Sequence, residues 1–263
     1  MSQVIDVLLI GGRGTIGAGL RTYMPRLDPG YRFVSVDLPG ARDKAVEPDV
    51  QRDFVDLDIA AEPEALADLA KGRDLVVYLA RKGDLATMNR MTDQVFEAVL
   101  GQEKPPMMVA SSSVHAVDGL YNFYEEGSVY WKMAERNFDD LPERIAAATP
   151  AHVANDYGRE KEHAERWVRR MAEQGHGAVA ARWGGINPTN EVHVPERGYF
   201  AVWCHQEDAA NFVHAWYRSH LDGSLPAGAH YFVISDNTDN IFDIETPKKE
   251  IGYAPKHDSE SHF

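Results

Sequence analysis

The chain is poor in cysteine and in positive charge, and it has no long hydrophobic run. Cys204 is the only cysteine in 263 residues, which excludes an internal disulfide and a cysteine-based zinc cluster and fits a reducing compartment. The 27 Lys and Arg against 41 Asp and Glu give a net charge of −14, which argues against nucleic-acid or membrane-surface partners. No apolar stretch approaches the roughly 20 residues of a membrane span, and no secretory signal is present. We therefore expect a cytoplasmic protein with no nucleic-acid or membrane partner.

Short buried-strand patterns alternate with helical patterns along the chain. Apolar residues make up 44% of the sequence, which is enough for a substantial core. The patterns predict strands over residues 4–10, 31–38, 74–80, 106–111, 178–183 and 230–234, and helices over residues 15–27, 85–100 and 156–174. This order predicts an α/β fold with a Rossmann-type, doubly wound parallel sheet. We expect one domain over residues 1–263 with a small C-terminal substrate-binding lobe.

Two regions depart from the alternating pattern. Residues 117–154 are rich in aromatic and acidic side chains and far exceed the loops of about 2–6 residues that are usual in α/β units. We expect this stretch to be a structured insertion. Residues 187–198 read as a polar loop, and we assign the substrate lobe to about 187–205 and 236–263.

A glycine-rich loop lies between the first predicted strand and the first helix. Gly11 allows a tight turn, Gly14 lets a pyrophosphate approach the backbone, and Gly17 allows the helix to pack against the sheet. The start of the helix supplies backbone N–H groups and a favourable dipole. The predicted cofactor-binding residues of this loop are Gly11, Gly14, Thr15, Ile16 and Gly17.

Asp37 ends the second predicted strand, 20 residues after Gly17. At this place a carboxylate accepts hydrogen bonds from the adenine ribose and repels a 2′-phosphate, which favours NAD over NADP. Arg13 and Arg42 are the counter-argument, because a nearby arginine accommodates that phosphate. We interpret both as surface residues.

Tyr157 and Lys161 lie four residues apart at the start of a predicted helix, so their side chains share one face. An ammonium group beside a phenol favours the phenolate, which acts as a general base. Ser111, Ser112 and Ser113 end a predicted parallel strand, at the sheet edge where ligands of such folds bind. A serine, tyrosine and lysine site is therefore predicted at this edge.

The ordered motifs over residues 4–161 resemble the extended short-chain dehydrogenase/reductase family. They are Gly11-x-x-Gly14-x-x-Gly17, Asp37, Asp56-Leu57, Val76-Val77-Tyr78-Leu79-Ala80, Asn89, Ser111-Ser112-Ser113 and Tyr157-x-x-x-Lys161. The resemblance implies that Ser113 polarises the substrate oxygen, Tyr157 is the general acid/base, and Lys161 binds the nicotinamide ribose and lowers the pKa of Tyr157. It also assigns to the NAD site Asp56 and Leu57, which flank the adenine, together with Leu79, Ala80, Asn89 and Tyr157 itself.

The second half of the chain is similar to uronate dehydrogenases and to NAD-dependent glucose-6-phosphate dehydrogenases. The similarity rests on Ala181–Pro188, Trp203–Asp208, and the stretch from Ile234 to Lys256 with Ser259. It implies NAD-dependent oxidation of the anomeric carbon of a sugar to a lactone. Where these enzymes have Asn after two serines, this chain has Ser113, and Arg159 and Glu160 also depart from their pattern.

Three cations are candidates for binding an acidic group on the sugar. Arg81 and Lys82 follow the strand that ends at Ala80, and Arg182 matches the arginine that meets the carboxylate in uronate enzymes. Together they predict a basic pocket for a carboxylate, phosphate or sulfonate. The alternatives are that Arg81 and Lys82 face solvent or a cofactor phosphate, and that Arg182 forms a buried ion pair. His115 either contacts sugar hydroxyls or caps a loop.

The sequence therefore predicts an NAD-dependent dehydrogenase that oxidises a small anionic sugar. One alternative is a nucleotide-sugar epimerase or dehydratase, against which the short chain after Tyr157 argues. Another is an NAD-binding regulator without catalysis, against which the retained Tyr157 and Lys161 argue. The eleven histidines show no metal-binding spacing, so we predict no metal. The family resemblance implies a possible homodimer through the helices at 85–100 and 157–174.

Overall fold

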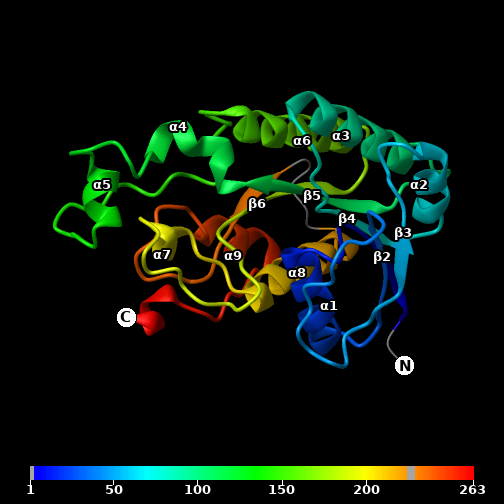
Figure 1. Cartoon of the computed structure of the whole chain (residues 1–263), viewed down its shortest axis with the longest axis horizontal. Coiled ribbons are helices and arrows are strands. Elements are labelled where there is room, and N and C mark those ends of the chain that lie inside the picture. Colours follow the sequence, from blue (N-terminus) through cyan, green and yellow to red (C-terminus); the bar gives the residue numbers. More distant parts are fainter. Residues whose placement is uncertain (1–2, 224–228) are drawn as a thin grey trace.

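The computed structural model of the protein describes residues 3–223 and 229–263 (Figure 1). Within these residues a parallel sheet of 7 strands has the order β3-β2-β1-β4-β5-β6-β7. The strands are β1 (Ile5–Ile10), β2 (Tyr31–Asp37), β3 (Phe54–Asp56), β4 (Leu75–Tyr78), β5 (Met107–Ser113), β6 (Ala178–Trp183) and β7 (His230–Val233). The helices are α1 (Thr15–Leu27), α2 (Pro63–Ala70), α3 (Leu85–Leu100), α4 (Asp118–Tyr121), α5 (Val129–Ala134), α6 (Asp156–Glu173), α7 (Tyr199–Val202), α8 (Gln206–Leu221) and α9 (Glu245–Ile251), with 3₁₀ turns η1 (Val114–Val117) and η2 (Ser259–His262).

Helices cover both faces of the sheet (Figure 1): α2, α3 and α6 lie on one side, and α1 and α8 lie on the other. Successive residues of β1 point to opposite faces, so Val7 and Leu9 join one core while Leu8 and Ile10 join the other. This explains why Val7–Ile10 are all apolar, as is typical of a strand buried on both faces. The predicted doubly wound parallel sheet is confirmed.

The strand order reverses at β1, whose neighbours are β2 on one side and β4 on the other. The connections that leave the carboxyl ends of β1 and β4 therefore run in opposite directions and open a crevice between them. In open α/β sheets this switch point is where ligands bind.

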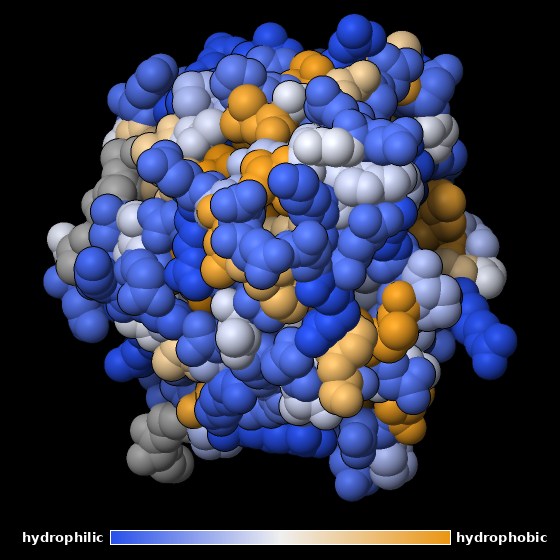
Figure 2. Space-filling view, turned by 90° about the vertical axis from the view of Figure 1, so that its left-hand side faces the viewer, coloured by the Kyte–Doolittle hydropathy of each residue, from blue (hydrophilic) through white to orange (hydrophobic). Residues whose placement is uncertain are grey.

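Most of the region over residues 117–154 follows β5 as α4, α5 and their connecting loops, and it extends away from the sheet beside α7 and the C-terminal segment (Figure 1). Tyr121, Phe123 and Met133 from this region form a third core with Phe232 and Phe242. On the face that these segments share, hydrophobic residues occur in small groups between hydrophilic ones (Figure 2). Among the described residues, none of the helices is long and apolar enough to cross a membrane.

Candidate active site

The loop between β1 and α1 has the close backbone contacts for which glycine is needed. Gly11 has a φ of +91°, and a Cβ there would lie 2.6 Å from the backbone nitrogen of Ala80. A Cβ on Gly17 would lie 2.5 Å from Cα of Gly12. Gly14 is the N-cap of α1, and no side chain in the described part of the protein caps this helix end. The first amides of α1, which include those of Thr15 and Ile16, are thus left for an anionic ligand.

Asp37 and Asp56 lie side by side at the carboxyl ends of β2 and β3. The Arg13 backbone N–H donates to Asp37 Oδ2 at 2.7 Å, and the Arg13 guanidinium is 2.5 Å from Asp56 Oδ1. Burial raises the pKa of Asp37, and the hydrogen bond and charge of Arg13 oppose this shift. Asp37 and Leu57 line a small cavity of about 110 Å³ together with Ala80, which we call the adenine-side cavity.

Ser113 and Tyr157 meet at the carboxyl edge of the sheet. Ser113 is the last residue of β5, Tyr157 lies in the first turn of α6, and the Ser113 side chain is close enough to lower the pKa of Tyr157. The Lys161 ammonium lies 5.0 Å from the centre of the Tyr157 ring, and the residue as a whole is 5% exposed. Burial lowers the pKa of Lys161 and raises that of Tyr157, while Ser113 opposes the shift of Tyr157. The structure therefore brings together the three residues predicted to be catalytic.

Glu160, to which the sequence analysis assigned no role, is a buried carboxylate beside this group. It is 2% exposed, and its Oε1 accepts a hydrogen bond of 2.8 Å from Arg81 Nε and lies 3.5 Å from Lys161 Nζ. The Arg81 guanidinium lies 5.2 Å from the centre of the Tyr157 ring. Burial and Ser113 have the largest effects on the pKa of Tyr157. Among the smaller effects, the negative charge of Glu160 raises this pKa and the positive charge of Arg81 lowers it. The sequence signal that could have indicated Glu160 as a site residue is its position three residues after Tyr157.

Replacing Glu160 with Gln is expected to move the rising limb of the pH–rate profile to lower pH. Oxidation by a tyrosine base needs the phenolate, so the rate rises as pH passes the pKa of Tyr157. Removing a negative charge that raises this pKa lets the phenolate form at lower pH. The measurement is kcat against pH for the wild type and Glu160→Gln, with Glu162→Gln of the same helix as the control. An unchanged limb, or one that moves to higher pH, contradicts the expectation.

A larger cavity of about 720 Å³ lies next to Ser113 and Tyr157. We call it the active-site cavity. Its walls come from the end of β5, the insertion, the start of α6, the segment after β6, and the loop before α7. The lining residues are Ile16, Ser111, Ser112, Ser113, Val114, His115, Asp118, Gly119, Tyr121, Asn122, Phe123, Tyr124, Glu125, Ala154, Asn155, Tyr157, Trp183, Gly184, Gly185, Ile186, Glu196, Arg197, Tyr199 and Val202.

The three cations predicted to form a basic pocket lie apart from one another. Arg81 pairs with Glu160, and Lys82 Nζ lies 2.5 Å from Asp58 Oδ2 on the wall of the adenine-side cavity. Arg182 is 0% exposed and bonded to Glu165. None of the three lines the active-site cavity. For Arg182 the structure has the buried ion pair that the sequence left as an alternative.

His115 lines the active-site cavity beside Tyr157, and the centres of the two rings are 5.5 Å apart. Its Nδ1 lies 2.8 Å from Asp118 Oδ1. Asn155, the N-cap of α6, accepts a hydrogen bond from the Gly158 N–H and donates to Asp118 Oδ2. An Asn two residues before Tyr157 was a capping signal that the sequence analysis did not use. His115 is thus held beside Tyr157 and remains a predicted sugar contact.

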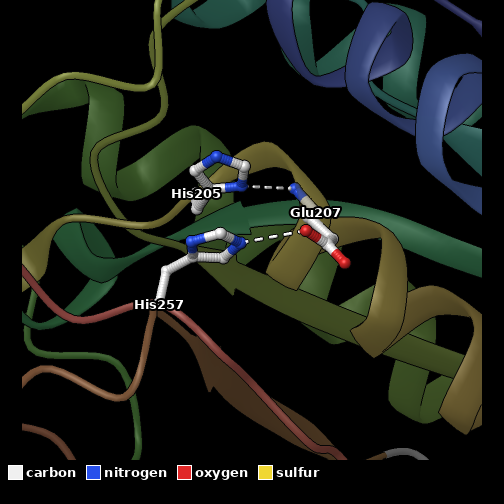
Figure 3. A group of neighbouring side chains, drawn as sticks. All are labelled: His205, Glu207 and His257. Carbon is white, nitrogen blue, oxygen red and sulfur yellow. Dashed lines mark hydrogen bonds and ion pairs between the residues drawn. The ribbon is translucent and has the colours of Figure 1, made fainter.

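His205, Glu207 and His257 gather at the start of α8, with one possible ligand atom of each within 4.8 Å of the others (Figure 3). The two imidazole rings are stacked, with centres 3.6 Å apart and an interplanar angle of 15°. Nitrogen lone pairs lie in the ring planes, so rings stacked in this way do not both direct one at a single ion. Burial lowers the pKa of His205 to about 4, and its Nδ1 accepts a hydrogen bond from the Glu207 N–H. His205 is the N-cap of α8, and His257 contacts Glu207 of the same helix. The prediction of no metal stays a prediction.

The comparisons with known proteins identify the family. The model of the NAD dependent epimerase/dehydratase family matches residues 7–186. The chain belongs to this family. A comparison with curated proteins finds no match.

Solved structures of other proteins share the fold of this NAD-dependent epimerase/dehydratase family member. Glucuronic acid dehydrogenase from Chromohalobacter salexigens has a TM-score of 0.73 at 18% identity, over 98% of this chain and 87% of that chain. Uronate dehydrogenase from Agrobacterium tumefaciens has a TM-score of 0.70 at 18% identity, over 98% and 86%. dTDP-glucose 4,6-dehydratase from Bacillus anthracis has a TM-score of 0.71 at 15% identity, over 98% and 93%. At these identities the likeness concerns the fold.

The predicted cofactor, NAD, is that of the family, and the residues present fit it. The glycine loop presents uncapped helix amides to a pyrophosphate, and Asp37 offers a carboxylate where a ribose is expected. Asn89, also predicted at this site, has a buried side-chain oxygen without a hydrogen-bond partner in the described part of the chain. The backbone N–H of Leu79 is bonded to Ile10, which fixes the strand end beside Gly11.

Proposed function

We propose that the protein oxidises the anomeric carbon of an acidic sugar to a lactone, with NAD as the oxidant. The observation that carries this proposal is the placement of Ser113 and Tyr157 together on the wall of the active-site cavity. The pair lies at the same sheet edge as the glycine loop, so a sugar in the cavity would lie beside the cofactor. The uronate dehydrogenases of the same fold support this choice.

In this proposal Tyr157 as phenolate removes the proton of the anomeric hydroxyl, while Ser113 donates a hydrogen bond to that oxygen. The Lys161 ammonium keeps the phenolate form accessible and binds the ribose of the cofactor. Arg81 adds positive charge over the Tyr157 ring, and Glu160 holds both cations in place. NAD, when bound, supplies the acceptor for the hydride that leaves the anomeric carbon.

The second candidate is an epimerase or dehydratase that acts on a nucleotide sugar. The fold likeness to dTDP-glucose 4,6-dehydratase, with a TM-score of 0.71, favours it as much as the likeness to the uronate enzymes favours oxidation. A dehydrogenase releases NADH, whereas an epimerase returns the hydride to its substrate. Net production of NADH therefore separates the two candidates.

The test is a panel of sugars mixed with purified protein and NAD. The panel contains hexuronates, hexose phosphates, sulfosugars, neutral aldoses and nucleotide sugars, and the readouts are NADH absorbance and the chemical identity of the product. We expect NADH and a lactone with at least one acidic sugar. Conversion of a nucleotide sugar without net NADH would establish the second candidate instead.

A further inference from the structure

A histidine and an aspartate form a pair on the wall of the active-site cavity that the proposed oxidation does not use. Nδ1 of His115 lies 2.8 Å from both carboxylate oxygens of Asp118. Asn155 donates to Asp118 Oδ2 at 3.3 Å, and all three residues line the cavity. A carboxylate on one imidazole nitrogen fixes the ring and its tautomer, so Nδ1 carries the hydrogen and Nε2 holds a lone pair.

The second nitrogen of His115 is free to take up a proton. Nε2 makes no hydrogen bond with the part of the chain that the structure describes. The side chain of His115 is 51% exposed and that of Asp118 is 18% exposed, so water reaches the imidazole. An imidazole that a carboxylate orients, and whose other nitrogen is open to water, has the arrangement of a general base.

One short turn holds this pair beside Ser113 and Tyr157. Ser113 is the N-cap of η1, which contains His115, and the Ser113 Oγ accepts a hydrogen bond of 3.2 Å from the His115 backbone N–H. The hydroxyl hydrogen of Ser113 therefore stays available for a ligand. The rings of His115 and Tyr157 meet edge to face, with centres 5.5 Å apart. A water on Nε2 and a sugar carbon held at Ser113 and Tyr157 can thus lie in contact within one cavity.

The proposed oxidation leaves its product in a position to react further. The anomeric oxygen becomes the carbonyl oxygen of the lactone, and Tyr157 becomes a neutral phenol when it takes up the proton. Ser113 and Tyr157 then both offer hydroxyl donors to this oxygen, as the donors of an oxyanion site do. A carbonyl group that is polarised in this way is open to attack by water.

We propose that the protein also hydrolyses the lactone, with His115 as the base that activates water and Asp118 as the residue that positions His115. The water oxygen forms a bond to the carbonyl carbon and gives a proton to Nε2 of His115. The bond from that carbon to the ring oxygen then breaks, and His115 returns the proton to the ring oxygen. Lactone and water thus give an open-chain hydroxy acid, and nothing is oxidised or reduced. The inference rests on the proposed function for the source of the lactone.

The direct test supplies lactones to the NADH-loaded protein and needs no oxidation. The probes are glucono-1,5-lactone and 6-phosphogluconolactone, and acid release is measured in a pH-stat against the protein-free rate. We expect the wild type to accelerate the opening of at least one lactone, and His115→Gln to lower this acceleration by about 10²- to 10⁴-fold. Asp118→Asn should lower it as well, because an amide no longer fixes the hydrogen on Nδ1. The control, with the acceleration unchanged, is His152→Gln, at an exposed position of the insertion that lines neither cavity.

Following NADH and acid together during sugar oxidation separates a base from a residue that only contacts the sugar. In the wild type the lactone should appear first, and the acid should follow faster than in protein-free buffer. In His115→Gln the lactone should accumulate and open at the protein-free rate, so that acid lags behind NADH. Loss of NADH and acid in parallel, or opening of both supplied lactones by the wild type at the protein-free rate, would overturn the inference. Lactone hydrolysis that depends on His115, without NADH from any sugar, would instead overturn the proposed oxidation and leave the inference standing.

Discussion

Tyr157→Phe is expected to lower kcat for sugar oxidation by about 10²- to 10⁴-fold, the usual contribution of a positioned general base. The substitution removes only the hydroxyl that the proposed reaction uses to take up a proton. The aromatic ring stays and keeps its contacts with His115 and with the Arg81 guanidinium. The measurement is kcat with saturating NAD and the sugar that the panel identifies.

NAD affinity is the internal control for this experiment, because Asp37, the glycine loop and Asn89 are untouched. Titration of Tyr157→Phe with NAD should give a dissociation constant close to that of the wild type, and the melting temperature should change little. Turnover within about threefold of the wild type would show that another group accepts the proton, since the expected loss is at least about 100-fold. This result would contradict the proposed role of Tyr157 as the base, but it would not contradict the proposed cofactor site.

The parts of the fold that the sequence predicted well have strong local signals. The helix predicted over residues 85–100 has the bounds of α3, where an apolar stripe begins after the N-cap Asp84. The elements that the sequence did not predict include β3, α2 and α8. β3 has only 3 residues and α2 has 8, which leaves too few residues for a clear period. α8 is buried along most of its surface, so its apolar residues do not form a single stripe.

In the candidate site, too, the sequence predicted contacts between residues close in the chain and missed those between distant residues. Tyr157 and Lys161 are one helical turn apart, so spacing alone predicted their shared face. Arg81 and Glu160 lie 79 positions apart in the sequence, and Arg197 and Glu135 lie 62 apart. Nothing in the spacing of one sequence indicates such pairs, because the packing of the insertion and of α6 brings them together. The predicted basic pocket relied on strand ends alone, and strand ends do not fix which way a long side chain turns.

Arg182 illustrates this limit, and the structure gives it a role in stability. Its Nε and Nη2 donate to the two carboxylate oxygens of Glu165 at 2.7 and 2.9 Å, and its Nη1 donates to the backbone oxygen of Thr149. Glu165 also accepts a hydrogen bond from Ser112, the neighbour of Ser113 in β5. Burial raises the pKa of Glu165, but the hydrogen bond and charge of Arg182 outweigh this and lower it overall. The pair therefore ties α6 to the strand ends that carry the site.

Arg182→Met is expected to destabilise the protein by about 3–5 kcal/mol, because it leaves the Glu165 carboxylate buried without its partner. For a chain of this size that corresponds to a fall in melting temperature of roughly 6–20 °C. The measurement is thermal and urea unfolding of the protein without ligands. The double variant Arg182→Met/Glu165→Gln should recover much of the loss, since no unpaired charge then remains buried.

The same variants distinguish this structural role from the direct substrate contact that the sequence predicted for Arg182. A direct contact would leave the melting temperature of the ligand-free protein unchanged in Arg182→Met and would raise KM selectively for acidic sugars. The double variant would then be as defective as the single one, because removing Glu165 does not restore a lost contact to substrate. Recovery of both stability and turnover in the double variant is the expected outcome, and it follows from the complete burial of Arg182 behind Ser112 and Glu165.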